Sequence, residues 1–536
     1  MIDLPSTLLV ASLATPLAFL GACFVEGWRR HALALQWLAP VPSLATGLIG
    51  LIRAPLVYDL PVLDFTLRLD PPGALLLAGA AVLWIVFSAA LWRDRQPDNR
   101  FGLSWLLTMT GNIGVFIAGD LVSFYLFYAL VSIPAYGLFA FSDDPEHKRS
   151  GAIYMAFTIL GEAILLLAFA MLATGEPLGS TRIANVVAAL PSSPWRDATL
   201  GLIIAGFGMK LGMAPFNGWM PLTYSAAPIP AAALLSGAGV KAGVIGLIRF
   251  LPLGVPMQGW GDCLVVLGFF SAFYGVAFGL TQQNPKVVLA YSSISQMGVI
   301  AAALGIALAK GQADGALDAA FYAANHLLVK AALFLAIGVL AARGAATLVL
   351  AAPLALSLAG LAFTGGALAK LATKAQFASG SEAALATLSS IGTALLMTHF
   401  LICLAVPSSR AAQECPSALV RFWPAAALGA ISLPWAFYPV VVGNASSAFE
   451  IGNLVDGLWP VALGVSLALV LRRRIRFAPH VPVGDSIVLE EAAFRRLLSI
   501  GPSLEKIDAC LRQWPMAGVS LLLIILALLT ASVSGS

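Results

Sequence analysis

Charged residues are scarce in this chain. Of its 536 residues only 10% are charged, while 60% are hydrophobic. A soluble globular protein has about a quarter of its residues charged, so these charges are too few to cover a water-soluble body of this size. The shortage excludes a cytosolic enzyme, a nucleic-acid-binding protein and a disordered scaffold. The composition instead predicts a polytopic membrane protein in contact with the lipid bilayer.

Cysteine and histidine are also sparse, with five residues of each type. The cysteines form no C-x-x-C pair and the histidines are dispersed, so no iron–sulfur, zinc or disulfide framework is recognisable. The sequence also shows no nucleotide-binding loop. We therefore expect no metal, no cofactor and no catalytic site within this chain, which leaves open whether it belongs to a larger enzyme.

Long apolar runs occupy most of the chain. A membrane-spanning helix needs about 20 mainly apolar residues, and the runs predict about 14–16 such helices joined by mostly short loops. They lie near 6–24, 32–52, 73–93, 102–118, 121–142, 152–174, 198–220, 228–250, 262–282, 287–308, 317–342, 346–376, 385–406, 420–443, 455–471 and 515–532. The first run lacks a preceding basic segment, which favours an uncleaved span over a signal peptide.

Basic residues concentrate in alternate loops. One side carries Arg29, Arg30, Arg93, Arg95, Arg100, Lys148 and Arg149, whereas the intervening loops carry only Arg53, Arg68, Arg182 and Arg196. Because basic loops stay in the cytoplasm, this pattern predicts an N-terminus outside the cell inner (plasma) membrane and the cluster at 472–474 inside.

Lysine does not follow the loop rule. Of nine lysines, Lys210, Lys241, Lys330 and Lys370 lie inside apolar runs. A lysine at the centre of the bilayer costs about 2.5–3.5 kcal/mol, so such residues are functional candidates by default. A desolvated lysine can also load and release a proton. The alternative is that the side chain reaches the headgroups, which suits Lys374, Lys310 and Lys286 near span ends better than the four internal lysines.

Two of the apolar runs contain helix-breaking residues. Pro215, Pro221, Pro228 and Pro230 cannot all lie in one regular helix, and they separate Lys210 from Lys241. Gly360, Gly365 and Gly366 precede Lys370 in the same way. Interrupted helices with ion sites beside the break are typical of transporters built from inverted repeats. A proline kink that serves packing alone is the other reading.

Two further ionisable groups lie inside apolar runs. His326 and Lys330 are four residues apart and so share one helix face. A histidine between lysines can pass a proton at physiological pH, although a lone buried histidine is more often a core residue, as we expect for His399. Glu162 is the only carboxylate deep within a long apolar run, and the lysines supply a counter-charge for it.

The motifs around these residues resemble a known family. They are MKLGMAPFNGWMPLTYSAAPIPAAALLSGAGVKAGVIGLIRF, PKVVLAYSSISQMGVI, NHLLVKAALFL and LAGLAFTGGALAKL, in one order over most of 100–375. The chain is similar to the antiporter-like subunits of respiratory complex I, Mrp-type cation/proton antiporters and group 4 membrane-bound hydrogenases. The run ALLSGAGVKAGVIGLIRF is closer to the hydrogenase and Mrp branches.

The resemblance implies an all-α membrane fold of two inverted five-helix repeats, each with a broken helix. It also implies a hydrated lysine, histidine and glutamate axis that conducts protons. Lys210 would be the broken-helix lysine of the first half and Lys370 the terminal lysine of the second. Lys241 and Lys330 would connect them, with His326 beside Lys330.

Several positions depart from the family pattern. The family places a glutamate where this chain has Ala129, so the usual partner of Lys210 is missing. Either Glu162 supplies the carboxylate from the next span, or the first half has lost pumping competence. Asn284 replaces the acidic neighbour expected near Lys286, and the second broken helix lacks the family's proline.

The predicted organisation has four parts. Residues 1–100 form N-terminal spans, 101–250 the first repeat, 251–410 the second repeat, and 411–536 the C-terminal spans. Within the last part, 484–512 is a charged, partly apolar connector that lies on the membrane surface, forms an interfacial helix or contacts a partner subunit.

Three functions remain open from the sequence. The first is a proton-translocating subunit of a multi-subunit membrane complex whose other subunits supply the driving reaction. The second is a standalone antiporter exchanging protons for Na⁺ or K⁺, although the membrane interior offers mainly Glu162 as a ligand for a hard cation. The third is a non-pumping structural subunit, which the alanine at position 129 suggests.

Overall fold

The computed structural model describes residues 4–53, 55–60, 65–94, 98–140, 144–377, 380–406, 415–475, 481–484 and 487. Within that part of the chain, 12 helical segments are long and apolar enough to cross a membrane. The protein is therefore a multi-pass membrane protein, as predicted. The segment expected at 102–118 corresponds to the helix α5 (Asn99–Ile117), and the segment expected at 198–220 contains the helix α9 (Arg196–Leu211). The segment expected at 515–532 lies outside the described residues.

The helices follow the apolar runs closely. The N-terminal part contains α1 (Leu4–Cys23), α2 (Glu26–Leu35), α3 (Val41–Arg53), α4 (Pro71–Asp94), α5 (Asn99–Ile117) and α6 (Leu121–Ser132). The middle contains α7 (Pro145–Gly175), α8 (Ile183–Ala189), α9 (Arg196–Leu211), α10 (Trp219–Ala226), α11 (Ile229–Leu234), α12 (Lys241–Phe250) and α13 (Gln258–Gly279). The remainder contains α14 (Pro285–Lys310), α15 (Gly315–Arg343), α16 (Thr347–Ser357), α17 (Gly365–Ala372), α18 (Gly380–Leu404), α20 (Ser417–Val442) and α21 (Ile451–Ile475).

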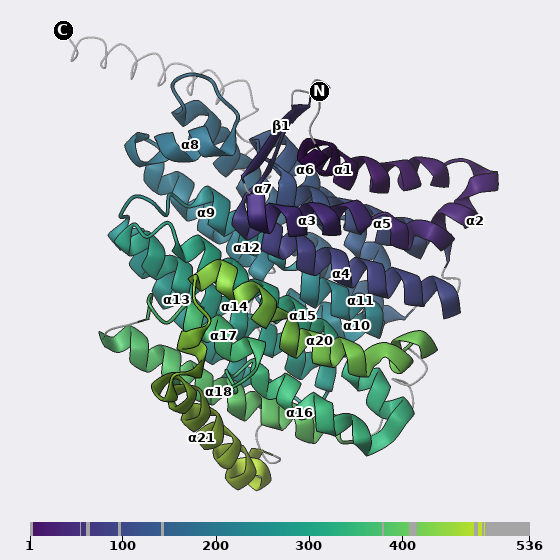
Figure 1. The fold of residues 1–536 in the computed structure, drawn as a ribbon, viewed down its shortest axis with the longest axis vertical. Coiled ribbons are helices and arrows are strands. Elements are labelled where there is room, and N and C mark those ends of the chain that lie inside the picture. Colours follow the sequence, from purple (N-terminus) through teal and green to yellow (C-terminus); the bar gives the residue numbers. More distant parts are fainter. Residues whose placement is uncertain are drawn as a thin grey trace, which may run out of the picture. The chain divides into compact units, whose positions relative to one another are not determined.

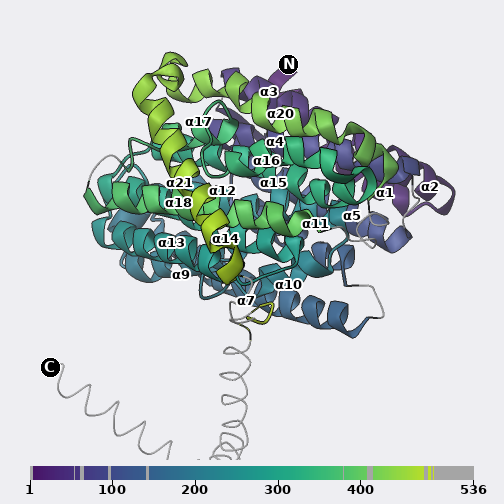
Figure 2. The same ribbon diagram turned by 90° about the horizontal axis from the view of Figure 1, so that it is seen from below.

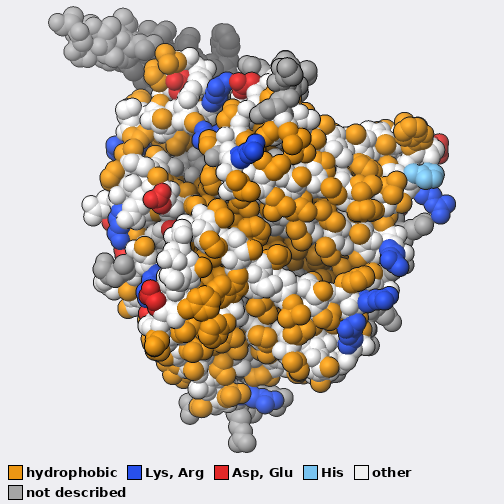
Figure 3. All heavy atoms as spheres, viewed as in Figure 1, with side chains coloured by type: hydrophobic (Ala, Val, Ile, Leu, Met, Phe, Trp, Pro, Cys, Tyr) orange, Lys and Arg blue, Asp and Glu red, His pale blue; other side chains and the backbone are white. Residues whose placement is uncertain are grey.

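The helices of the first compact unit, Met1–Val483, run side by side (Figure 1). The segments Ile229–Phe250 and Lys286–Leu308 are buried throughout, and Figure 2 shows α12 and α14 among the surrounding helices. Apolar side chains cover most of the face in Figure 3, with charged groups gathered mainly near the helix ends. Such a surface suits a lipid bilayer.

A second compact unit comprises Gly484–Ser536. Only Gly484 and Ile487 of this unit are described, so nearly all of the connector predicted at 484–512 lies outside the described residues. The predicted boundaries of the four-part organisation therefore stay predictions.

One element was not predicted. Residues expected to form a loop between spans instead contain a two-stranded antiparallel hairpin, β1 (Leu56–Leu60) and β2 (Phe65–Leu69). Its alternating side chains explain the strand geometry, since Leu67 and Leu69 are fully buried on one face. The all-α expectation therefore holds for the spans but not for this connection.

Small residues allow α13 to pack closely against α14. Gly261, Gly268 and Gly275 recur every seven residues on α13, and a Cβ atom on any of them would approach the backbone of α14 to within 3.0 Å. Glycines at such spacing let membrane helices approach each other closely. The contact supports α14, whose Leu289 carbonyl accepts a hydrogen bond from Lys330.

Arg249 joins three separate segments at one end of the bundle. Its guanidinium donates to both carboxylate oxygens of Asp70 at 3.1 Å, and to the carbonyl oxygens of Val115, Phe116 and Ala118 at 2.6–3.0 Å. Burial alone raises the pKa of the Asp70 carboxyl. The charge and hydrogen bonds of Arg249 and the hydrogen bond from the Gly73 N–H lower this pKa and together outweigh the effect of burial, so the net shift is downward. The cluster closes the last turn of α5.

Replacing Arg249 by methionine is expected to destabilise the protein by about 3–5 kcal/mol, because the Asp70 carboxylate and the α5 carbonyl groups lose their donor. Unfolding followed by tryptophan fluorescence in detergent measures the change. Arg182→Met is the control, since its pair with Asp59 is half exposed and is worth about 0–1 kcal/mol. Equal losses in the two variants would contradict the assignment.

The same cluster predicts a pH dependence. The folded-state pKa of Asp70 lies below its unfolded value, so the carboxylate stabilises the folded protein above the unfolded pKa. That contribution is lost as the pH falls through the folded pKa. The stability difference between the wild type and Asp70→Asn should therefore be largest at neutral pH and shrink below about pH 4.

Candidate functional site

Both predicted broken helices are present. The first breaks between α9 and α10, where Gly212 has a φ of 64° and Pro215 follows. The second breaks between α16 and α17, where Gly360 has a φ of 95°. At Gly366 a Cβ atom would overlap the Ser357 carbonyl, so the chain crossing at this break requires glycine. Each break lies within reach of a lysine.

Lys210 lies in the last turn of α9, directly before the first break. Its Nζ donates to the Ser132 hydroxyl of α6 at 2.7 Å and lies 5.7 Å from the centre of the Tyr128 ring. Ala129 precedes Ser132 by three residues and therefore lies on the same face of α6. The position at which the resemblance implies a glutamate thus holds only a methyl group in this chain.

Glu162 lies near Lys210 but on a different helix, α7. Its side chain is buried, and its Oε1 atom has no hydrogen-bond partner among the described residues. A cavity of about 20 Å³ is lined by Glu162, Lys210, Ser132 and Tyr154. That volume accommodates one water molecule between polar groups. The carboxylate missing at position 129 therefore has a counterpart beside the same lysine.

Lys241 and His326 meet at the centre of the bundle. Lys241 Nζ lies 2.7 Å from His326 Nδ1 and donates to the Ser236 carbonyl at 3.0 Å, and both side chains are fully buried. The sequence placed His326 beside Lys330, one turn along α15. In the structure the direct hydrogen bond of His326 is instead to Lys241, 85 residues away.

Lys330 is likewise fully buried, and its Nζ donates to the Leu289 carbonyl of α14 at 2.7 Å. Farther along, Tyr322 donates to Gln296 at 2.9 Å, and Gln296 donates to Thr393 at 3.1 Å. Sequence reasoning missed these neutral polar groups, although hydroxyl and amide residues inside apolar runs were the available signal.

Lys370 follows the second break on α17. Its Nζ donates to the Ala359 carbonyl at 2.6 Å and to the Ser390 hydroxyl. It faces a cavity of about 410 Å³ that Tyr322 and Lys374 also line. Lys374 itself is exposed and bonds Asn453 and Asp456 at 2.8 Å, which agrees with its predicted position near a span end.

The internal lysines share an electrostatic feature. Among the described residues, none of Lys241, Lys330 and Lys370 forms an ion pair within 4 Å of a carboxylate. Their partners are carbonyl oxygens, hydroxyls and an imidazole. Lysines held by neutral acceptors in a buried setting are suited to exchanging protons with neighbouring groups.

Two other predicted positions have defined surroundings. Lys286 was expected near the headgroups, but it is largely buried in the first turn of α14 and donates to the Ala227 carbonyl at 3.0 Å. It lines a cavity of about 650 Å³ together with His147 and Arg149. His399 is buried with its Nε2 2.7 Å from the Gln282 carbonyl, as expected for a core histidine.

The fold and site define a class of protein: multi-pass membrane proteins with two interrupted helices, a lysine beside each break, and further lysines buried in the helices that lie between the breaks in the sequence. The family model described as NADH:quinone oxidoreductase/Mrp antiporter, TM, matches residues 118–396. The chain belongs to this family, which confirms the resemblance drawn from the sequence.

Curated relatives come from three kinds of membrane protein. The chain is 32% identical over 306 residues to the A/B component of a probable K(+)/H(+) antiporter from Rhizobium meliloti, covering 56% of this chain and 30% of the relative. It is 26% identical over 355 residues to hydrogenase-4 component B of Escherichia coli, covering 61% of this chain and 52% of that protein. It is 30% identical over 293 residues to NADH-quinone oxidoreductase subunit N of Desulforudis audaxviator, covering 52% and 56%. The chain thus spans between 30% and 56% of the length of these relatives.

Solved structures support the fold. A chain of the Mrp complex from Dietzia sp. aligns with a TM-score of 0.76 at 20% identity, covering 100% of this chain and 63% of that one. A chain of the membrane-bound sulfane sulfur reductase, described as an archaeal respiratory membrane complex, aligns with a TM-score of 0.66 at 21% identity, covering 84% and 99%.

Proposed function

We propose that this chain conducts protons as an antiporter-like subunit of a multi-subunit membrane complex. The route runs through Glu162, Lys210, Lys241, His326, Lys330 and Lys370. The observation that carries the proposal is the buried contact of 2.7 Å between Lys241 and His326, because it joins groups from the two halves of the chain. The family of the chain and the kinds of relatives it matches support the same conclusion.

Each group has a defined role in this proposal. Glu162 and Lys210 exchange a proton through the small cavity between them and set the charge at the first break. Lys241 passes a proton directly to His326 along their hydrogen bond. Lys330 and Lys370 continue the route through bridging water, with Tyr322 and Ser390 beside the final cavity.

Coupling along the route is electrostatic. Two unit charges about 4–8 Å apart interact by about 2–4 kcal/mol at an effective dielectric near 20, so protonation of one site changes the affinity of the next. No redox cofactor is needed within the chain for this step. The driving reaction belongs to partner subunits, consistent with the complexes named for the structural neighbours.

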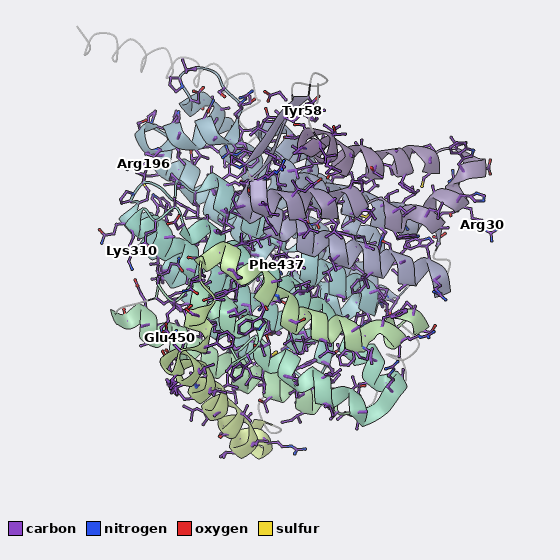
Figure 4. All side chains as sticks on the ribbon, viewed as in Figure 1. Arg30, Tyr58, Arg196, Lys310, Phe437 and Glu450 are labelled. Atoms are coloured by element: carbon purple, nitrogen blue, oxygen red, sulfur yellow. The ribbon has the colours of Figure 1, made fainter. Side chains whose placement is uncertain are left out.

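The proposal includes an arrangement in the membrane. Residues 101–250 and 251–410 are the two inverted repeats, and the N-terminus lies outside the cell inner membrane. Figure 4 shows Arg30 at the opposite end of the bundle from Arg196 and Lys310. A membrane-impermeant maleimide applied to intact cells should label a cysteine placed at Arg196 and not one placed at Arg30; the reverse would overturn the orientation.

The test of the proposed function uses the assembly that co-purifies with a tagged chain. Reconstituted into liposomes, that assembly should transport protons when its driving reaction is supplied, as read by a pH-sensitive dye. Proton movement by the chain alone, driven by a Na⁺ or K⁺ gradient, would instead establish a standalone antiporter. Normal proton transport by an assembly whose internal lysines are all replaced would establish a structural subunit.

A further inference from the structure

A π-helix precedes Lys241. Residues Leu235–Gly239 adopt it between α11 and α12, and the Val240 N–H bonds to the Leu235 carbonyl five residues back. A π-turn carries one more residue than an α-turn and is often found at functional sites. Here its Ser236 carbonyl accepts the hydrogen bond of Lys241 Nζ at 3.0 Å. The position of the amine therefore depends on the position of this turn.

Asn112 of α5 holds the other end of the π-helix. Its Nδ2 donates to the Ala238 carbonyl at 3.1 Å, and its Oδ1 accepts from the Trp84 indole at 3.0 Å. An indole N–H can only donate and a carbonyl can only accept, so the orientation of the amide is fixed by its two partners. Asn112 is fully buried and Trp84 almost so.

The π-helix is also confined by packing. A Cβ atom on Gly237 would lie 3.0 Å from Leu83 and 3.2 Å from the Leu327 carbonyl, so the turn fits closely between α4 and α15. The Ser236 hydroxyl lies 3.1 Å from the Ser293 hydroxyl of α14. The turn that presents Lys241 to His326 is therefore fixed on several sides, and Asn112 is its side-chain donor from α5.

We propose that Asn112 is a positioning residue for the Lys241–His326 pair. By bonding Ala238, it keeps the π-helix in the register that directs the Ser236 carbonyl at Lys241 and the Lys241 amine at His326. Trp84 orients the Asn112 amide and contributes to stability, but its hydrogen bond is to Asn112 and not to the π-helix. The expected effect on proton transport rests on the proposed function. The positioning role of Asn112 itself rests on these contacts alone.

Cross-linking tests the geometry without reference to transport. Ser236→Cys and Ser293→Cys are introduced into a full-length chain whose five native cysteines are replaced, and the pair is oxidised with iodine. Hydroxyls 3.1 Å apart place the two sulfur atoms within reach of a disulfide after a small rotation. The rate of disulfide formation, read as the loss of free thiols by mass spectrometry, then reports the position of the π-helix.

Asn112→Leu should slow this cross-linking by about ten-fold, because the turn loses its buried donor. Trp84→Phe is the matched control: it removes the indole donor and weakens the edge-on contact with Trp105, yet leaves the bond to Ala238, and should cross-link within about two-fold of the parent chain. If Asn112→Leu does not fold, Asn112→Asp, which keeps the acceptor for Trp84, should slow cross-linking in the same way.

Equal cross-linking rates in the parent and Asn112→Leu chains would overturn the proposal. The proposal would also be overturned if Trp84→Phe slowed cross-linking as much as Asn112→Leu, because this would indicate a general loosening of the packing. A failure of the parent pair to cross-link would overturn it as well. In the reconstituted assembly Asn112→Leu should lower proton transport by about 10–100-fold while Trp84→Phe retains most of it. If cross-linking behaves as expected but Lys241→Met transports normally, the proposed function fails and the positioning role stands.

Discussion

Lys210→Met and Lys370→Met are each expected to lower proton transport by the reconstituted assembly by about 100-fold or more, because a group that transfers protons is lost at each end of the route. Both lysines lie beside a helix break and bond hydroxyl groups that methionine cannot engage. The initial rate of the pH-dye signal, normalised to the amount of assembled complex, measures the effect.

Lys374→Met is the matched control for this pair. Lys374 lies four residues beyond Lys370, but its amine is exposed and bonds Asn453 and Asp456 at the surface. We expect it to retain most of the transport. Wild-type rates in Lys210→Met and Lys370→Met, with assembly intact, would show that neither lysine takes part.

Glu162→Gln should reduce transport strongly, because the carboxylate that offsets the charge of Lys210 is removed from their shared cavity. At an effective dielectric near 20, two unit charges about 4–8 Å apart interact by about 2–4 kcal/mol, which corresponds to roughly 30–1,000-fold in the equilibrium between charge states. Glutamine keeps the size and most of the packing of the side chain. The same dye assay reads the loss.

The fold also predicts a rescue. Ala129 lies three residues before Ser132 on α6, and the Ser132 hydroxyl accepts from Lys210, so Ala129→Glu places a carboxylate where the resemblance implies one. The double variant Glu162→Gln, Ala129→Glu should recover a large part of the lost transport, and Ala129→Glu alone is its control. Full activity in Glu162→Gln would instead assign the first half a structural role.

The sequence predicted which lysines lie inside the helices better than it predicted their contacts. Lys210, Lys241, Lys330 and Lys370 could be recognised because an ammonium in an apolar run conflicts with the cost of burial. Proline and glycine located both helix breaks, since their backbone restrictions act locally. These signals depend on a few neighbouring residues and need no knowledge of packing.

The features that could not be predicted from the sequence depend on contacts between segments far apart in the chain. The partner of His326 is Lys241, 85 residues away, whereas local spacing had indicated Lys330. The π-helix before Lys241 has no local signature, because it is held by Asn112 from another helix. The hairpin at Leu56–Leu60 and Phe65–Leu69 escapes prediction, since two short strands between spans resemble an ordinary connection.

The most direct test of the central claim removes the group that joins the two halves. His326→Leu leaves every lysine in place but breaks the contact with Lys241. His399→Leu makes the same change at a buried histidine whose hydrogen-bond partners among the described residues are Gln282 and Cys403. The account predicts that proton transport by the reconstituted assembly is lost in His326→Leu and retained in His399→Leu. Equal transport in His326→Leu and the wild type would contradict a continuous route through the buried lysines.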